Sequence, residues 1–405
     1  MSFAESVAVP VTDRWGPWLT YADALTAAGD PRGEAVRLEH LHDTGGAKGT
    51  TADPGAAYVR VEQDLGLDRL RADGSWQFTW SRGFVDTAVF RPAAETASRR
   101  GALVERLLAD LPHTWTYDPA DAEQWEAALI DVLLSHPATR LLGELELHLT
   151  DYHHSAERAA VALSRRSWPR LEALHFGHDF DLLLELHTTS TGNRVDPETY
   201  LNDPVVPKPV ERALWASLPA LRNLALEGAY LFDDLEHDAL THLRTRGSVF
   251  ADGSLFDFST PALVSLEVVS DHDVHGTVAS NAQLEALDAA RFPRLRSLDL
   301  SEAEFEADEA GHFVVLAESS LLPQLKYLSI RDLVIEDTDE DRTPLAVLAD
   351  LAPRFAHLDF HVWGDIDVEG ADGEDVELIL SAHGLSQYAD SSDTGDDTGD
   401  DTGTG

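Results

Sequence analysis

Hydrophobic and polar residues follow one short pattern at seven places between Leu142 and Phe360. Each copy has an apolar residue, two variable residues, a second apolar residue, one variable residue and a third apolar residue, and six copies follow a proline. Alternate side chains of a strand point to opposite faces, so each copy predicts a strand that buries its apolar residues. The central residues of the copies are Leu145, Leu174, Leu224, Leu266, Leu298, Leu328 and Leu358.

Segments with helical periodicity lie between these copies, at residues 157–166, 209–217, 234–246, 283–291, 312–321 and 344–351. Each ends near the next proline, because the residue before a proline is disfavoured in a helix. A strand and a helix that recur about every 30 residues resemble the leucine-rich-repeat family. The resemblance implies an α/β fold, a leucine-rich-repeat solenoid with a parallel sheet on its concave face.

The first 73 residues lack this pattern and predict two helices. The first covers residues 15–28 and places four residues on one buried stripe, namely Trp18, Tyr21, Ala22 and Leu25. The second begins near Arg32 and turns three residues inward, namely Ala35, Leu38 and Leu41. The Gly- and Asp-rich segment 43–57 predicts a loop.

Residues 76–90 predict a hairpin that caps the end of the sheet and leads into a degenerate first copy centred on Ala88. Capping is expected because an open end would expose apolar side chains and a strand edge. Two further amphipathic helices are expected at 94–111 and 121–135, with room for one more strand at 113–118.

Two strings in the N-terminal segment, Tyr21 to Leu25 and Gly29 to Leu38, resemble the repeat-companion domain that accompanies leucine-rich repeats in bacterial proteins. Ala24 stands where that family has Trp, and Ala35 and Val36 where it has Phe and Ile. The resemblance implies no catalytic residues. The expected organisation is a helical module at 1–73, the repeat region at 74–388 and a tail at 389–405 that has nothing apolar to bury.

Two intervals between the central residues are longer than the others. Successive separations are 29, 50, 42, 32, 30 and 30 residues. The excess predicts insertions within 177–217 and 247–260, which would emerge as loops on one face and could contribute to binding.

The strand pattern also predicts which side chains face outward. Positions three, five and seven of each copy alternate with the buried positions and project from the concave face. This face is expected to be acidic with histidines at both ends, and to bind a protein partner. The candidate binding residues are Glu144, Glu146, His148, His175, Glu227, Glu267, Asp299, Tyr327, Arg331, His357, Asp359 and His361.

The formal charge of −43 comes from 73 acidic and 30 basic residues. Such a field repels phosphate backbones and anionic membranes, so neither nucleic acid nor membrane is expected as a partner, whereas a basic protein is. The chain has no cysteine, and its N-terminus lacks the pattern of a secretory signal. We therefore expect a cytoplasmic protein without disulfides or cofactors.

Three alternatives to a non-catalytic binding scaffold remain open. His357, Asp359 and His361, with Asp365 or Asp367, could bind a divalent metal and support a metal-dependent enzyme. Residues 365–370 begin like a calcium loop, but Val376 occupies the place of its bidentate acid. Finally, the N-terminal module could make the partner contact while the repeats serve as a spacer. No catalytic motif is found, so an enzyme is not expected.

Overall fold

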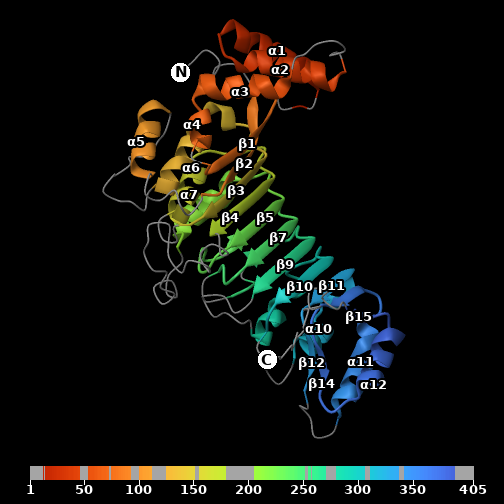
Figure 1. The fold of residues 1–405 in the computed structure, drawn as a ribbon. Helices are drawn as coiled ribbons and strands as arrows, with labels where there is room; N and C mark the ends of the chain where they lie inside the picture. Colours follow the sequence, from red (N-terminus) through yellow and green to blue (C-terminus); the bar gives the residue numbers. More distant parts are fainter. Residues whose placement is uncertain are drawn as a thin grey trace, which may run out of the picture. The chain divides into compact units, whose positions relative to one another are not determined.

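In this computed structural model the described residues are 12, 14–45, 53–72, 74–92, 100–111, 125–150, 155–178, 205–250, 254–256, 258–270, 280–305, 311–336 and 342–387. The fold is mixed α/β, and the strands of its main sheet are mostly parallel (Figure 1). Two compact units are present. The first unit comprises residues 1–261 and 273–275, and the second comprises 262–272 and 276–405. The boundary expected at residue 73 therefore lies inside the first unit.

The first unit begins with two helices, α1 (Trp15–Ala27) and α2 (Arg32–Asp43). The predicted stripe of α1 is confirmed, since its four residues are the buried ones. In α2, Ala35 is buried as expected, but Leu41 is 39% exposed and Val36 is buried instead. The helices approach closely because Gly33 has no side chain; a Cβ there would lie 2.6 Å from the carbonyl oxygen of Ala22.

Two more helices follow, α3 (Pro54–Leu65) and α4 (Asp68–Arg71). Asp53 caps α3 by accepting a hydrogen bond from the backbone N–H of Gly55. Pro54 favours the first helical turn, because its missing N–H needs no partner there. The loop expected as far as residue 57 is thus wrong over its last four residues.

The predicted hairpin is confirmed by the antiparallel strands β1 (Trp76–Ser81) and β2 (Phe84–Phe90). Arg82 and Gly83 have φ values of 51° and 82°. Positive φ at both central residues matches the right-handed twist of the strands that a tight hairpin joins. β2 then pairs in parallel with β3 (Glu144–Leu149), with Ala88 opposite Leu145 as predicted.

The strands of the first unit run in the order β1-β2-β3-β4-β5-β7. β4 (Ala173–His178), β5 (Asn223–Glu227) and β7 (His242–Arg246) extend the parallel part. The central residues face one another, since Leu145 pairs with Leu174, Leu174 with Leu224, and Leu224 with Leu243. All are buried, so this row forms one line of the core. A small separate sheet joins β6 (Leu235–Glu236) to β8 (Phe258–Ser259).

Strand β7 corrects the helix predicted over residues 234–246. That segment contains the short β6 and then β7, so the long interval between Leu224 and Leu266 holds an additional strand and not only an insertion. The sixth position of the strand pattern is taken by Thr245, which is buried although it is polar.

Helices α5 (Arg100–Asp110), α6 (Trp125–Ser135), α7 (Ser155–Ser164) and α9 (Lys208–Ser217) connect these strands, with a 3₁₀ turn η4 (Pro137–Thr139) after α6. α7 packs against both α6 and α9, and Figure 1 shows α6 and α7 next to each other. α6 is buried from Trp125 to Leu134, so the helix predicted as amphipathic over 121–135 is covered on every side, because most of its residues are apolar. Its buried Glu126 accepts a hydrogen bond from the backbone N–H of Thr150.

The main strands of the second unit run in the order β9-β10-β11-β13-β15. They are β9 (Ser265–Ser270), β10 (Ser297–Ala303), β11 (Tyr327–Ile330), β13 (Asp359–Val362) and β15 (Ser386–Gln387). Leu298 lies opposite Leu266 and Leu328, again as a buried row. β12 (Leu333–Ile335) and β14 (Ile366–Val368) form a second parallel pair.

The connections of the second unit are η7 (Asn281–Ala286), α10 (His312–Glu318), η8 (Leu322–Gln324), α11 (Pro344–Phe355) and α12 (Gly373–Ala382). η7 is a 3₁₀ helix, where the sequence predicted an α-helix over 283–291. α11 runs through Pro353 to Phe355, beyond its predicted end.

Several expectations fall outside the described residues. They are the strand at 113–118, most of the insertion within 177–217, and the tail at 389–405. Among the described residues, no helix is both long and apolar enough to cross a membrane.

Candidate functional site

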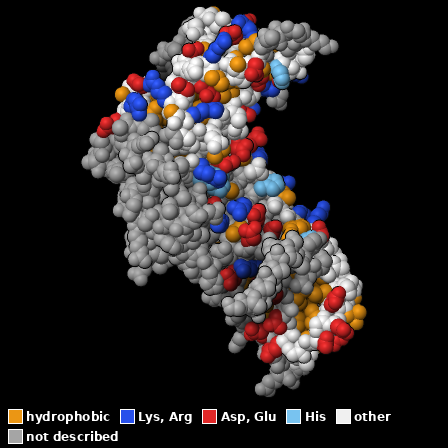
Figure 2. Space-filling view, viewed as in Figure 1, with side chains coloured by type: hydrophobic (Ala, Val, Ile, Leu, Met, Phe, Trp, Pro, Cys, Tyr) orange, Lys and Arg blue, Asp and Glu red, His pale blue; other side chains and the backbone are white. Residues whose placement is uncertain are grey.

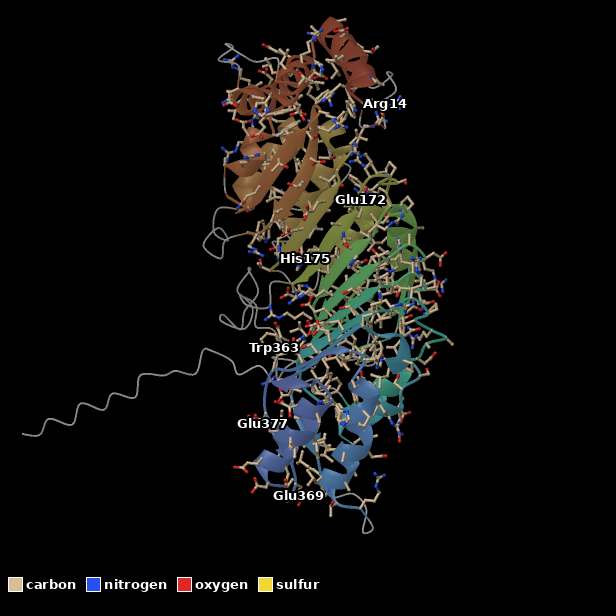
Figure 3. The ribbon with its side chains drawn as sticks, turned by 90° about the vertical axis from the view of Figure 1, so that its right-hand side faces the viewer. Arg14, Glu172, His175, Trp363, Glu369 and Glu377 are labelled. Atoms are coloured by element: carbon tan, nitrogen blue, oxygen red, sulfur yellow. The ribbon has the colours of Figure 1, made fainter. Side chains whose placement is uncertain are left out.

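Parallel pairing in the first unit brings the outward side chains of neighbouring strands together. Glu146 of β3 is opposite His175 of β4, and His148 of β3 is opposite Gly177 of β4. Gly177 is in turn opposite Glu227 of β5, which is opposite Arg246 of β7. Figure 3 shows His175 on the strand face turned toward the viewer.

Two histidines form the centre of this face. The rings of His148 and His175 have centroids 4.2 Å apart and planes inclined by 31°. His148 contacts Glu146 through Nε2 and Oε2 at 3.1 Å, and Nη2 of Arg91 lies 3.0 Å from the same nitrogen. If Nε2 of His148 carries a proton, it can donate to the carboxylate of Glu146. If it does not, it can accept a hydrogen bond from the guanidinium of Arg91.

A buried carboxylate joins the second histidine to strand β7. Oε2 of Glu227 lies 3.6 Å from Nε2 of His175, and Oε1 accepts a hydrogen bond from Nη1 of Arg246 at 2.9 Å. We call the connected residues Arg91, Glu146, His148, His175, Glu227 and Arg246 the histidine ladder. It runs across the neighbouring strands β3, β4, β5 and β7.

Burial lowers the pKa of His175 to about 3, and positive charge from His148, Arg244 and Arg91 acts in the same direction. His175 is therefore neutral near pH 7. A neutral His175 can pack against the ring of His148 without charge repulsion, even if His148 is protonated.

The expected acidic character of this face is wrong for the first unit. Arg91 follows β2, and Arg244 and Arg246 belong to the unpredicted strand β7, so three arginines lie among the carboxylates. Figure 2 shows basic, acidic and histidine side chains close together on the described surface. The face can therefore form charge-assisted hydrogen bonds with groups of either sign.

The predicted residues Glu144, Glu146, His148, His175 and Glu227 do gather on one face, with Glu144 at the start of β3 and exposed. The sequence contains only part of the pattern that would have placed Arg244 and Arg246 on this face. Leu240 and Leu243 keep the spacing of the pattern, whereas Thr245 breaks it at the third apolar position.

The second unit carries a separate row on the strand face opposite its leucines, and one member of that row, Ser329, is fully buried. Glu267 of β9 is opposite Asp299 of β10, and Asp299 is opposite Ser329 of β11. Asp299 accepts hydrogen bonds from the backbone N–H and hydroxyl of Ser301, at 3.0 and 2.6 Å. Arg331 lies within 3.7 Å of Glu304. This row keeps an acidic surplus, in agreement with the expectation.

The last strand corrects the predicted positions of three residues. Leu328 pairs with Phe360 and not with Leu358, so the strand is shifted by two residues relative to the pattern. His361 therefore takes position five and lies beside Tyr327, with ring centroids 5.5 Å apart. Asp359 takes position three and contacts His361 at 3.0 Å. Trp363, 44% exposed, follows in position seven.

His357 does not belong to this face. It lies in the turn after α11, and its Nε2 is 3.2 Å from the carbonyl oxygen of Leu322. The expected alternation of His357, Asp359 and His361 on one strand is thus wrong, because α11 continues two residues past Pro353 and delays the start of β13.

The calcium hypothesis required residues 365–370 to form a tight loop. Residues Ile366–Val368 instead form strand β14, which spreads Asp365, Asp367 and Glu369 along an extended backbone. Within the described part of the chain, no group of three or more His, Asp or Glu residues has an arrangement that could hold a metal ion.

Comparison with known proteins adds no family assignment: no protein-family model and no curated protein matches the chain.

Proposed function

We propose that this chain is a leucine-rich-repeat β-α solenoid, of the kind found in bacteria with an N-terminal repeat-companion module, and that it is a non-catalytic scaffold for protein binding. One observation supports this most directly. Strands far apart in sequence pair in parallel with their central leucines opposite one another, so their outward residues form continuous rows. Such rows present a broad surface for another protein.

The two units offer surfaces of different charge. The histidine ladder of the first unit mixes arginines with carboxylates, whereas the second unit presents Glu267, Asp299 and Asp359. We propose that the second surface contacts basic groups of the partner, since complementary charge steers association and sets orientation. A cytoplasmic protein that binds neither nucleic acid nor membranes fits the net charge of −43.

The test is affinity capture from the native host with three forms of the full chain. The first form is unchanged, the second carries Glu267→Gln with Asp299→Asn, and the third carries Glu377→Gln with Asp350→Asn. The third form removes two charges from helices α12 and α11 and so controls for net charge.

A partner that is recovered with the first and third forms, and lost or weakened at least about tenfold with the second, supports the proposal. Equal recovery of all partners with all three forms would show that the second unit's strand face is not the binding surface. Capture repeated at two salt concentrations measures the electrostatic part, because exposed charge pairs weaken as salt rises.

A further inference from the structure

A pocket of about 500 Å³ opens in the first unit between α2, α3 and strand β1. Its walls include Glu39, His42, Tyr58, Glu62, Arg71 and Trp80, and we call it the helix-hairpin pocket. Val59 also lines it and is 53% exposed, so the pocket is open to a ligand from solution. It is not part of the strand face described above.

One wall of the pocket is aromatic. The rings of Tyr58 and Trp80 are stacked, with centroids 5.4 Å apart and planes inclined by 15°. Hydrogen bonds hold both residues: the indole Nε1 of Trp80 donates to Glu62 at 2.7 Å, and the hydroxyl of Tyr58 accepts from the backbone N–H of Gly83 at 3.0 Å. A fixed aromatic surface attracts cations through its ring electrons.

Glu62 supplies a buried carboxylate with unused hydrogen-bonding capacity. Only 6% of the residue is exposed. Its Oε1 accepts both internal bonds, from Trp80 Nε1 at 2.7 Å and from Arg71 Nη2 at 2.9 Å. Among the described residues, no donor lies within hydrogen-bonding distance of Oε2. A carboxylate oxygen that accepts no hydrogen bond within the described part of the protein can accept one from a cationic ligand in the pocket.

Glu39 adds a second carboxylate. Its Oε2 accepts bonds from the Tyr58 hydroxyl and from the backbone N–H of Arg82. Its Oε1 accepts a longer bond from the hydroxyl of Ser81, at 3.4 Å, and no other from the residues that the structure describes. Burial raises the pKa of both Glu39 and Glu62, which means that each ion lacks part of its hydration. A cation bound nearby would stabilise the ionised forms.

The charges around the pocket also favour a cation. Among the described residues that line it are three acids, Glu39, Asp53 and Glu62, and one arginine, Arg71. Arg71 is already engaged, since it pairs with Glu62 and stacks at 4.2 Å over the ring of Phe78. These described residues therefore carry a surplus of two negative charges when His42 is neutral.

We propose that the helix-hairpin pocket binds the guanidinium group of an arginine side chain presented by a protein partner. A guanidinium is planar, so it can lie against the aromatic wall while its N–H fork points at Glu62 Oε2 and Glu39 Oε1. An ammonium group lacks both the plane and the fork. The proposal adds a second contact to the scaffold function, on the N-terminal helices and the hairpin.

The test uses a monovalent probe, because the net charge of −43 would attract any polycation without a specific site. N-acetyl-arginine methylamide is titrated into the ¹⁵N-labelled full chain, and the indole N–H signal of Trp80 is followed by NMR. That signal is assigned by its loss in Trp80→Phe. N-acetyl-citrulline methylamide has nearly the same shape without the charge, and N-acetyl-lysine methylamide carries the charge without the plane.

We expect a saturable shift with the arginine probe, weaker binding of the lysine probe and no saturation with the citrulline probe. Glu62→Gln keeps an acceptor for Trp80 and Arg71 but removes the charge, and should weaken arginine binding at least about tenfold. Asp23→Asn, which removes a charge from α1 outside the pocket, should leave it unchanged.

Val59→Arg gives an independent variant, because the position is exposed and the new side chain would place its own guanidinium at the mouth of the pocket. It should abolish probe binding even if Glu62→Gln fails to fold. The proposal is overturned by the absence of a saturable shift, by equal binding of the citrulline or lysine probe, or by full binding in Val59→Arg. None of these outcomes depends on the strand-face capture experiment, so the two proposals fail separately.

Discussion

The imidazole rings of His148 and His175 pack against each other across neighbouring strands, with their centroids 4.2 Å apart and their planes tilted by 31°. This ring contact holds a buried neutral histidine in a row that also contains Arg91, Glu227 and Arg246. The protonation of His175 should therefore be linked to folding.

His175→Gln tests this linkage. The folded pKa of about 3 lies below the ordinary value of 6.5, so the unfolded chain binds more protons between these two pH values. Stability is fully present above pH 6.5 and is lost as pH falls. When the pH falls from 7 to 5, the free energy of unfolding measured with urea should decrease by about 1–2 kcal/mol more for the unchanged chain than for His175→Gln. Parallel pH curves for the two proteins would contradict the prediction; His242→Gln, on the exposed side of β7, is the control.

Glu211 should make the stability of the unchanged chain depend on pH in the opposite direction, and Glu211→Gln should remove this dependence. Glu211 is fully buried in α9, accepts the backbone N–H of Asp233 at 2.9 Å, and has its pKa raised by burial to about 7. The folded chain then binds more protons between pH 4.5 and 7, so stability falls as pH rises through this window. Between pH 5 and pH 8 the free energy of unfolding of the variant should rise by on the order of 2 kcal/mol relative to that of the unchanged chain. The exposed Glu236→Gln should show no such gain.

Gly177→Ala should disrupt the pairing of β4 with β5. An added Cβ would lie 2.0 Å from the backbone oxygen of Glu227, and backbone cannot give way as a flexible side chain can. A loss of about 2–3 kcal/mol in the free energy of unfolding is expected. Gly16→Ala in α1 is the matched control, because no atom lies within 4 Å of the added Cβ. Equal stability of the two variants would mean that this strand contact is not as close as described.

Leu298→Ala should destabilise the second unit by about 2–5 kcal/mol, because Leu298 is fully buried between Leu266 and Leu328. Leu378→Ala removes the same atoms from a position that is 68% exposed and should change stability by no more than about 0.5 kcal/mol. Thermal unfolding followed by circular dichroism measures both. A small effect at Leu298 would argue against a continuous leucine row.

Predictions from the sequence were most accurate for features that depend only on residues close together in the chain. The buried stripe of α1 follows from spacings of three and four residues within a single helix. The central leucines follow from alternation within single strands, and their mutual pairing follows from their equal positions in each copy. These features need no knowledge of distant contacts.

The predictions were wrong where the local sequence fits two different structures equally well. From Leu358 to Val362 apolar and polar residues alternate, so registers centred on Leu358 and on Phe360 bury equally regular sets of side chains. The length of α11 decides between them. In β7 the buried Thr245 stands where an apolar residue was required, and the spacing of Leu235, Leu240 and Leu243 also suits a helix.

The candidate site shows the same division. Alternation placed Glu146, His148 and His175 on the outward face, but their partners depend on which strands are neighbours. Arg246 reaches Glu227 only because β7 pairs with β5. The helix-hairpin pocket had no sequence signal, since its carboxylates and rings come from three separate elements.

Strand β7 shows that the connecting segment and the strand row can vary independently. Leu224 and Leu243 are paired although only 19 residues separate them, whereas 29 separate the paired Leu145 and Leu174. The connection between two paired strands can therefore lack a helix, as between β5 and β7, while the outward side chains keep their register. Variation in the length of these connections would therefore leave the positions of the outward strand residues unchanged, while substitutions on the strands alone would change the chemistry of that face.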